Sequence, residues 1–141
     1  MKTRTQGNKI AFLGLILGSS LNFLFFSCED KSPYTHGKIL YENFCANCHM
    51  EDGTGLLNII PPLAGADYLH LYPEKLPCLI RAGIKGDVLV NGKTYSTEMP
   101  GVPKLTEFEI TNVINYINTS WGNDNKIVKH LDVRNALKEC E

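Results

Sequence analysis

The five residues from Cys45 to His49 place two thiols and an imidazole within little more than one helical turn. Their spacing, C-x-x-C-H, is the attachment sequence for c-type haem. Each thiol can add to one vinyl group of the macrocycle, and the histidine that follows is then placed under the iron as its proximal axial ligand. The motif therefore predicts a haem site at Cys45, Cys48 and His49, with His49 as a metal ligand.

The same cysteine pair is open to two other interpretations. A C-x-x-C pair alone also occurs in thioredoxin-like dithiol centres and as half of a zinc site. A zinc site needs a second pair of cysteines or histidines at metal-ligand spacing. The remaining candidates are scattered singly along the chain: His36, His70, His130, Cys78 and Cys140. This scatter favours haem over zinc.

A second axial ligand is expected on the other face of the ring, because a filled sixth position excludes oxygen and peroxide from an iron that only carries electrons. Met50 directly follows the proximal ligand and cannot reach that face. Met99 lies much further on, in a turn-rich segment, so the chain can wrap around the haem edge before it. A thioether ligand favours ferrous iron and raises the reduction potential relative to a second histidine. We expect Met99 to be this ligand; the alternative is a core methionine.

The N-terminus has the composition of an export signal in this chain of 141 residues. Three basic residues, Lys2, Arg4 and Lys9, precede a mostly apolar run over residues 10–26. A membrane helix usually needs about 20 predominantly apolar residues, and this run is shorter and has polar interruptions. The sequence therefore predicts a signal peptide over residues 1–27.

The apolar run ends in a small residue before a cysteine, Ser27-Cys28, which resembles a bacterial lipobox. The resemblance implies cleavage before Cys28 and lipidation of that residue, although Phe25 and Phe26 stand where small residues are usual. The alternatives are an uncleaved anchor and plain secretion. The first two interpretations both predict a soluble domain, membrane-anchored through a short tether (residues 28–34), that faces the periplasm or the cell exterior.

The charge balance argues against one class of partner. The full chain has 14 basic and 15 acidic residues. Cleavage after residue 27 removes three basic residues and no acidic one, so the mature chain carries a net charge of −4 (11 − 15). This balance, without a lysine-rich face, argues against nucleic acid.

Two cysteines remain after the lipid site and the haem motif are assigned. Unassigned cysteines often pair in an oxidising compartment. We therefore expect a disulfide between Cys78 and Cys140, which would attach the C-terminal tail to the body of the domain. The alternative is that Cys78 is a small buried apolar residue and Cys140 a free thiol of the tail.

Periodicity predicts helices along most of residues 35–122. The first runs from about Thr35 into the haem motif, a second piece covers residues 66–71, and a third covers residues 73–82 with Pro77 in the first turn of its regular part and Gly83 at its end. Residues 88–95 are expected to form a small hairpin with Asn-Gly at the turn.

The clearest helix follows a capping box made by Thr106 and Glu109. Its expected apolar face consists of Phe108, Ile110, Val113, Ile114, Tyr116 and Ile117. In the tail, residues 123–141, we expect one short amphipathic helix over residues 127–139.

The ordered set of motifs over residues 35–121 resembles the class I, mono-haem cytochromes c, of the small bacterial lipoprotein type. Beyond the haem attachment and Met99-Pro100, residues 61–65 (Pro-Pro-Leu-Ala-Gly) resemble the family's Pro-x-Leu-x-Gly segment. Four further residues resemble the pairs at which the first and last helices cross: Gly37 and Tyr41 on the first helix, Val113 and Tyr116 on the last.

The resemblance implies an all-α cytochrome c fold, with three to five helices around one covalent haem c and a small hairpin before the distal methionine loop. It implies that the Pro61 carbonyl accepts a hydrogen bond from Nδ1–H of His49. It also implies a respiratory-chain electron carrier rather than an enzyme, with a terminal oxidase, a quinol-oxidising complex or a periplasmic dehydrogenase as partner. The alternatives are a fixed cytochrome subunit of a multi-subunit oxidoreductase and a haem redox or gas sensor.

Overall fold

The computed structural model describes residues 34–140. The predicted signal peptide (1–27) and the predicted lipidation site at Cys28 lie outside the described residues, as does the tether up to residue 33. Within residues 34–140, no helix has the length and apolar character needed to cross a membrane.

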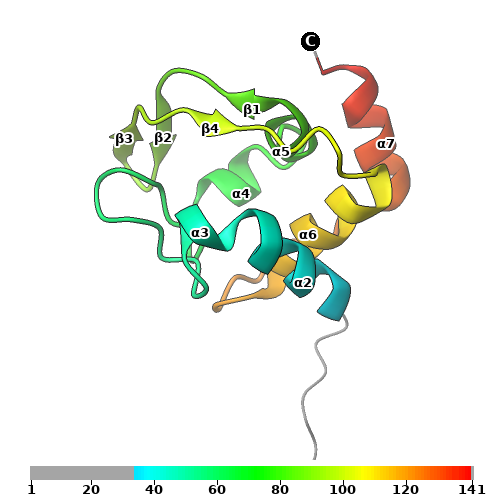
Figure 1. Cartoon of the computed structure of the whole chain (residues 1–141), viewed down its shortest axis with the longest axis horizontal. Helices are drawn as coiled ribbons and strands as arrows, with labels where there is room; N and C mark the ends of the chain where they lie inside the picture. The colour runs from blue at the N-terminus through cyan, green and yellow to red at the C-terminus, as the bar shows by residue number, and fades with distance from the viewer. Residues whose placement is uncertain (1–33, 141) are drawn as a thin grey trace, which may run out of the picture. The chain divides into compact units, whose positions relative to one another are not determined.

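The described residues form a mostly helical domain with two small antiparallel sheets (Figure 1). The helices are α2 Thr35–Phe44, α3 Ala46–His49, α4 Tyr68–Leu71, α5 Leu76–Ala82, α6 Glu107–Thr119 and α7 His130–Lys138. The strands are β1 Gly83–Ile84, β2 Val88–Val90, β3 Lys93–Tyr95 and β4 Met99–Pro100. The six helical segments exceed the predicted three to five because the chain leaves the helical conformation at Cys45, which divides the first helix into α2 and α3.

Helices α2 and α6 cross in direct contact and form the framework of the domain (Figure 1). The crossing requires a glycine, because a Cβ on Gly37 would lie 2.8 Å from Cβ of Tyr116 and even closer to the backbone oxygen of Asn112. One turn further along α2, the ring of Tyr41 packs against that of Tyr116 with their centroids 5.5 Å apart. The predicted glycine–aromatic crossing is therefore present, with Tyr116 and the backbone of Asn112 against the glycine.

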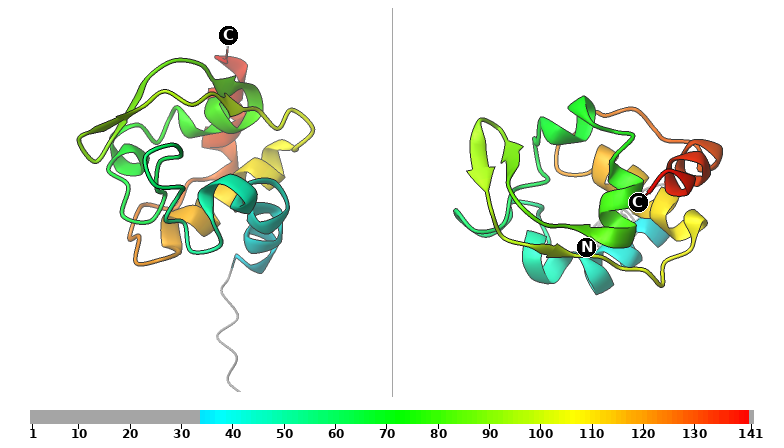
Figure 2. Two further views of the ribbon diagram at one scale, coloured as in Figure 1. Left: turned by 60° about the vertical axis from the view of Figure 1, so that its left-hand side comes forward. Right: turned by 90° about the horizontal axis from the view of Figure 1, so that it is seen from above.

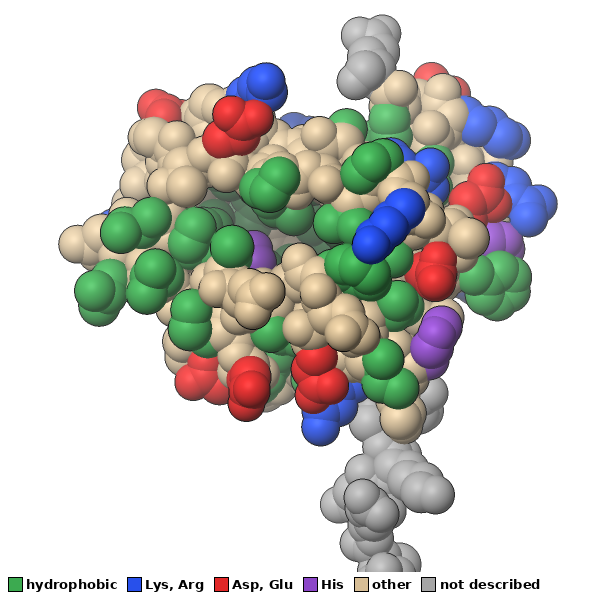
Figure 3. Space-filling view, viewed as in Figure 1, with side chains coloured by type: hydrophobic (Ala, Val, Ile, Leu, Met, Phe, Trp, Pro, Cys, Tyr) green, Lys and Arg blue, Asp and Glu red, His purple; other side chains and the backbone are tan. Residues whose placement is uncertain are grey.

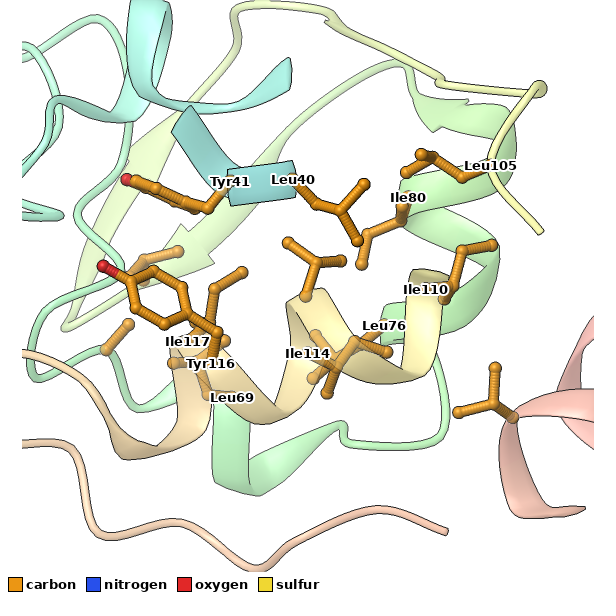
Figure 4. Close-up of a cluster of buried hydrophobic side chains, with 14 of the residues drawn as sticks. Leu40, Tyr41, Leu69, Leu76, Ile80, Leu105, Ile110, Ile114, Tyr116 and Ile117 are labelled. Carbon is orange, nitrogen blue, oxygen red and sulfur yellow. The ribbon is translucent and has the colours of Figure 1, made fainter. Parts of the chain in front are cut away.

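Helix α6 contributes five of the fifteen buried hydrophobic residues of the described core, more than any other helix (Figure 4). Its predicted capping box is confirmed: the Thr106 hydroxyl accepts a hydrogen bond from the Glu109 backbone, and the Glu109 carboxylate accepts one from the Thr106 backbone. The predicted apolar face is wrong at Phe108, which is 63% exposed. Its ring instead lies beside that of His130 in the next helix, with the centroids 4.3 Å apart.

Local sequence signals set the boundaries of α5 and of the hairpin. Pro77 occupies the first turn of α5, where a missing backbone N–H costs no intrahelical hydrogen bond, and Gly83 caps the other end. Strands β2 and β3 pair as the predicted hairpin. The two turn residues, Asn91 and Gly92, have φ angles of 51° and 74°, as a tight hairpin turn requires.

The second sheet is absent from the sequence-based prediction. Strand β1 pairs with β4, so that Gly83 is opposite Pro100 and Ile84 is opposite Met99. Because α5 leads directly into β1, this pairing attaches the Met99 segment to the end of α5.

The C-terminal tail folds back on the domain, where α7 contacts α5 and α6 (Figures 1 and 2). The helix begins at His130 rather than at residue 127, because Asn115 of α6 holds the preceding backbone in an extended form through two hydrogen bonds with Val128. A disulfide joins Cys78 of α5 to Cys140 just after α7. The tail is thus attached covalently to the helix that leads into β1.

Candidate functional site

An apolar cavity opens on one face of the domain, between α3, the loop after it, α5 and the two sheets (Figure 3). Its walls include Leu69, Ile80, Val90, Tyr95 and Ile114, all of which belong to the buried core. A hollow with such walls can hold a large, flat, hydrophobic ligand, with few polar groups to fix its orientation.

The C-x-x-C-H motif forms one wall of this cavity. Cys45 lies between α2 and α3, and its carbonyl accepts a hydrogen bond from the backbone of His49 at 2.9 Å. This single turn places the side chains of Cys45, Cys48 and His49 along the same cavity. Both thiols are free, so each can react with a ligand bound there.

The imidazole of His49 is held by the loop that follows the motif. Its Nδ1 lies 3.1 Å from the carbonyl oxygen of Pro61, which can only accept, so Nδ1 carries the proton and donates. Burial lowers the pKa of His49, and the hydrogen bond to Pro61 partly opposes this effect. A neutral imidazole with its proton on Nδ1 keeps the Nε2 lone pair for a metal.

Two aromatic side chains fix the backbone just beyond His49. The hydroxyl of Tyr41 donates to the carbonyl of Met50 at 2.6 Å, and Nε1 of Trp121 donates to the carbonyl of Glu51 at 3.0 Å. The Trp121 indole also covers Gly53, where an added Cβ would lie 2.5 Å from Cε3 of the ring. Tyr41 and Trp121 therefore tie the wall that carries His49 to the α2–α6 crossing.

No local sequence pattern indicates these two hydrogen-bonding roles. The ring of Tyr41 packs at the predicted helix crossing, but the use of its hydroxyl depends on the path of the chain after His49. Burial is the first cause that raises the pKa of Tyr41, so this hydroxyl stays protonated and able to donate.

The dithiol and zinc alternatives fit this site less well than haem. Burial, with a smaller effect of Cys48, raises the pKa of Cys45 to about 11. A dithiol redox centre needs a thiolate and usually lowers a cysteine pKa instead. Within residues 34–140 there is no group of three or more His, Cys, Asp or Glu side chains that could hold a metal ion.

Met99 lines the same cavity as His49. It lies in β4, is half-buried, and reaches the cavity from a segment far from the C-x-x-C-H motif in sequence. The three other histidines lie elsewhere: His36 and His70 are exposed, and His130 is beside Glu107 on α6.

The donor set and the walls together fit a covalently attached haem. Two free thiols, one imidazole with an available Nε2 and one thioether all line a single cavity whose other walls are apolar. Side chains of these types attach haem c, and histidine and methionine together are a known pair of iron ligands in cytochromes c.

Comparison with known proteins agrees with this fit. Residues 34–121 match the model of the family described as Cytochrome c. Over 87 residues the chain is 36% identical to cytochrome c-552 of Thermus thermophilus, a match that covers 59% of this chain and 66% of that protein. Over 90 residues it is 38% identical to the cytochrome c subunit of alcohol dehydrogenase (quinone) from Gluconacetobacter polyoxogenes, covering 62% of this chain and 19% of that subunit. The chain therefore spans less than two thirds of the length of these relatives.

Proposed function

Because the chain belongs to the cytochrome c family, we propose that it is a membrane-tethered, mono-haem electron carrier that passes single electrons between redox proteins. The family implies one covalent haem c. The observation that carries the proposal is the convergence of Cys45, Cys48, His49 and Met99 on one apolar cavity.

Each of these side chains has a separate role. Cys45 and Cys48 would hold the macrocycle through thioether bonds, and Nε2 of His49 and Sδ of Met99 would bind the iron. When bound, haem supplies an iron that alternates between the ferric and ferrous states. Pro61 fixes the tautomer of His49 and raises its basicity as a ligand. The apolar walls exclude water and so disfavour the ferric state, which carries the larger charge.

The location belongs to the same proposal. A signal peptide over residues 1–27 and lipidation at Cys28 would deliver the domain to the outer side of a membrane and hold it there. The disulfide between Cys78 and Cys140 supports an oxidising compartment. A tether raises the effective concentration of the domain near partners in the same membrane. Labelled fatty acid should be incorporated into the unaltered protein and not into Cys28→Ser, whereas an unaltered protein that takes up no label would contradict lipid anchoring at Cys28.

The ligand assignment is tested with Met99→Ala. Met50→Ala is the matched control, because Met50 is a methionine directly after the C-x-x-C-H motif that is not expected to bind the iron. Met99→Ala should retain covalent haem, lose the weak near-infrared absorption band of methionine bound to ferric iron, lower the reduction potential and allow CO to bind the ferrous protein. Met50→Ala should change none of these. A Met99→Ala protein that keeps the band and excludes CO would remove Met99 from the iron.

A fixed subunit of a multi-subunit oxidoreductase is the second candidate function. The similarity to cytochrome c subunits of alcohol dehydrogenase (quinone) favours it. Native mass measurement after gentle solubilisation of the membrane distinguishes the two: a stoichiometric partner indicates a fixed subunit, whereas a monomer that exchanges electrons with added redox proteins indicates a carrier.

A further inference from the structure

The segment that carries Met99 lies directly against the end of α5. Strand β4 pairs with β1, and the backbone of Val102 then donates to the carbonyl of Ile80 at 2.8 Å. The chain is therefore hydrogen-bonded to the α5–β1 segment at Met99 and again three residues later. In this way α5 and β1 determine where Met99 enters the cavity.

Two glycines make this approach possible. A Cβ on Gly101 would lie 2.5 Å from the carbonyl carbon of Ala82 and 2.6 Å from the carbonyl oxygen of Arg81. A Cβ on Gly83 would lie 2.6 Å from the backbone nitrogen of Gly101 and even closer to the carbonyl oxygen of Met99. All of these neighbours are backbone atoms, so a side chain could be accommodated only if the two segments moved apart.

Two glycines that follow Gly83 in sequence lack this close contact with backbone atoms. Gly86 has a φ of 93° and Gly92 a φ of 74°, but a Cβ at either position would meet no atom within 4 Å. Gly83 combines a φ of 80° with the close contact, whereas Gly101 has the contact without a positive φ. Backbone strain and steric contact can therefore be separated by experiment.

We propose that Gly83 and Gly101 are positioning residues for the distal iron ligand: their missing side chains let the Met99 segment lie on the end of α5, at the distance from which the Met99 thioether reaches the iron. This inference rests on the proposed role of Met99. It assigns to the two glycines a function in coordination, beyond the turn that Gly83 makes at the end of α5.

The test compares Gly101→Ala and Gly83→Ala with Gly86→Ala in the haem-loaded protein. Gly101→Ala and Gly83→Ala should lose the near-infrared methionine–iron band, have a lower reduction potential and bind CO when reduced, while covalent haem attachment and far-ultraviolet circular dichroism are retained. Gly86→Ala has comparable backbone strain but open space, so it should keep the band and exclude CO.

The Met99→Ala and Gly101→Ala proteins together distinguish the role of the glycines from the role of Met99. If Met99→Ala opens the iron to CO and Gly101→Ala does not, Met99 is a ligand but the glycines do not position it. If Met99→Ala itself changes nothing, the ligand assignment fails first. Should neither glycine variant yield folded protein, amide hydrogen exchange of Val102 in the unaltered protein replaces the test: strong protection is expected, and exchange at the rate of an unstructured chain would overturn the proposal.

Discussion

The two walls of the cavity that carry the proposed ligands are held in different ways. On the wall of His49, side chains make the attachments: the imidazole donates to Pro61, and Tyr41 and Trp121 donate to the two carbonyls that follow the motif. On the wall of Met99, backbone makes them, through two strands of two residues each that approach at Gly83.

The difference predicts an order in which the site fails. The wall of His49 is tied to the α2–α6 crossing and, once haem is attached, also by two thioether bonds. The wall of Met99 depends on the position of α5, which α7 and the disulfide hold from the other side. A perturbation that reaches α5 should therefore release Met99 while His49 stays in place.

Removal of the disulfide should have the largest effect on stability. The double substitution Cys78→Ser and Cys140→Ser opens a loop whose ends are 62 positions apart in sequence. The loop-entropy model gives a loss of about 4 kcal/mol in the free energy of unfolding. Because Cys78 lies on α5, the methionine–iron band should also disappear at a lower denaturant concentration than the helical signal. Circular dichroism and near-infrared absorption, followed in one titration, measure both effects.

Glu139→Ser serves as the control, because it changes an exposed residue next to Cys140 and leaves the crosslink intact. It should leave both transitions nearly unchanged. A double cysteine variant in which the two transitions still coincide would show that α5 does not control the wall of Met99.

Loss of the Tyr41 hydroxyl should have an intermediate effect, confined to the wall of His49. Tyr41→Phe keeps the ring on Tyr116 but leaves the carbonyl of Met50 without this donor. That carbonyl still accepts a hydrogen bond from the backbone of Gly53 at 3.2 Å, so the loss is that of one hydrogen bond, about 0.5–1.5 kcal/mol. The free energy of unfolding should fall by this amount, while the methionine–iron band remains until the whole domain unfolds.

Tyr72→Phe is the matched control, since it removes a hydroxyl from a tyrosine that is 38% exposed. It should cost much less than Tyr41→Phe. Early loss of the methionine–iron band in Tyr41→Phe would contradict the separation of the two walls.

Sequence could predict the elements whose signals are local. The capping box at Thr106 and Glu109, the Asn-Gly turn of the hairpin and Pro77 in the first turn of α5 each depend on a few neighbouring residues, and each is present. The C-x-x-C-H motif has a strong chemical signature, so its residues could be predicted from sequence; they line one cavity together with Met99, the predicted second ligand.

The parts that sequence could not predict depend on contacts between distant segments. Strands β1 and β4 are too short to show alternation, and their pairing follows from the close approach at Gly83. Phe108 fits the periodicity of a buried face, yet its actual neighbour is His130, in a helix whose position on the domain no local pattern gives.

The smallest predicted effect concerns the salt bridge between α7 and α6. It holds α7 in addition to the disulfide that joins the end of the tail to α5. Nε of Arg134 on α7 donates to the carboxylate of Glu107 on α6 at 2.9 Å, and this hydrogen bond is the main cause that lowers the pKa of Glu107 below its ordinary value of 4.5. A lowered pKa in the folded protein means that the carboxylate stabilises the fold above pH 4.5, and that this contribution is lost as the pH falls through the folded-state pKa.

Glu107→Gln should therefore lower the melting temperature slightly at neutral pH and not at pH values below the folded-state pKa. Added salt should reduce the difference, because the pair is exposed to solvent. Glu42→Gln, which removes an exposed carboxylate paired with Lys38 within α2, controls for the loss of a surface charge. Since Glu107 acts mainly through Arg134 of α7 and only weakly through the charge of Arg81 on α5, the methionine–iron band should be unchanged in Glu107→Gln at every pH where the domain is folded. A loss of the band in this variant would mean that the wall of Met99 depends on the whole of α7 rather than on its disulfide to α5.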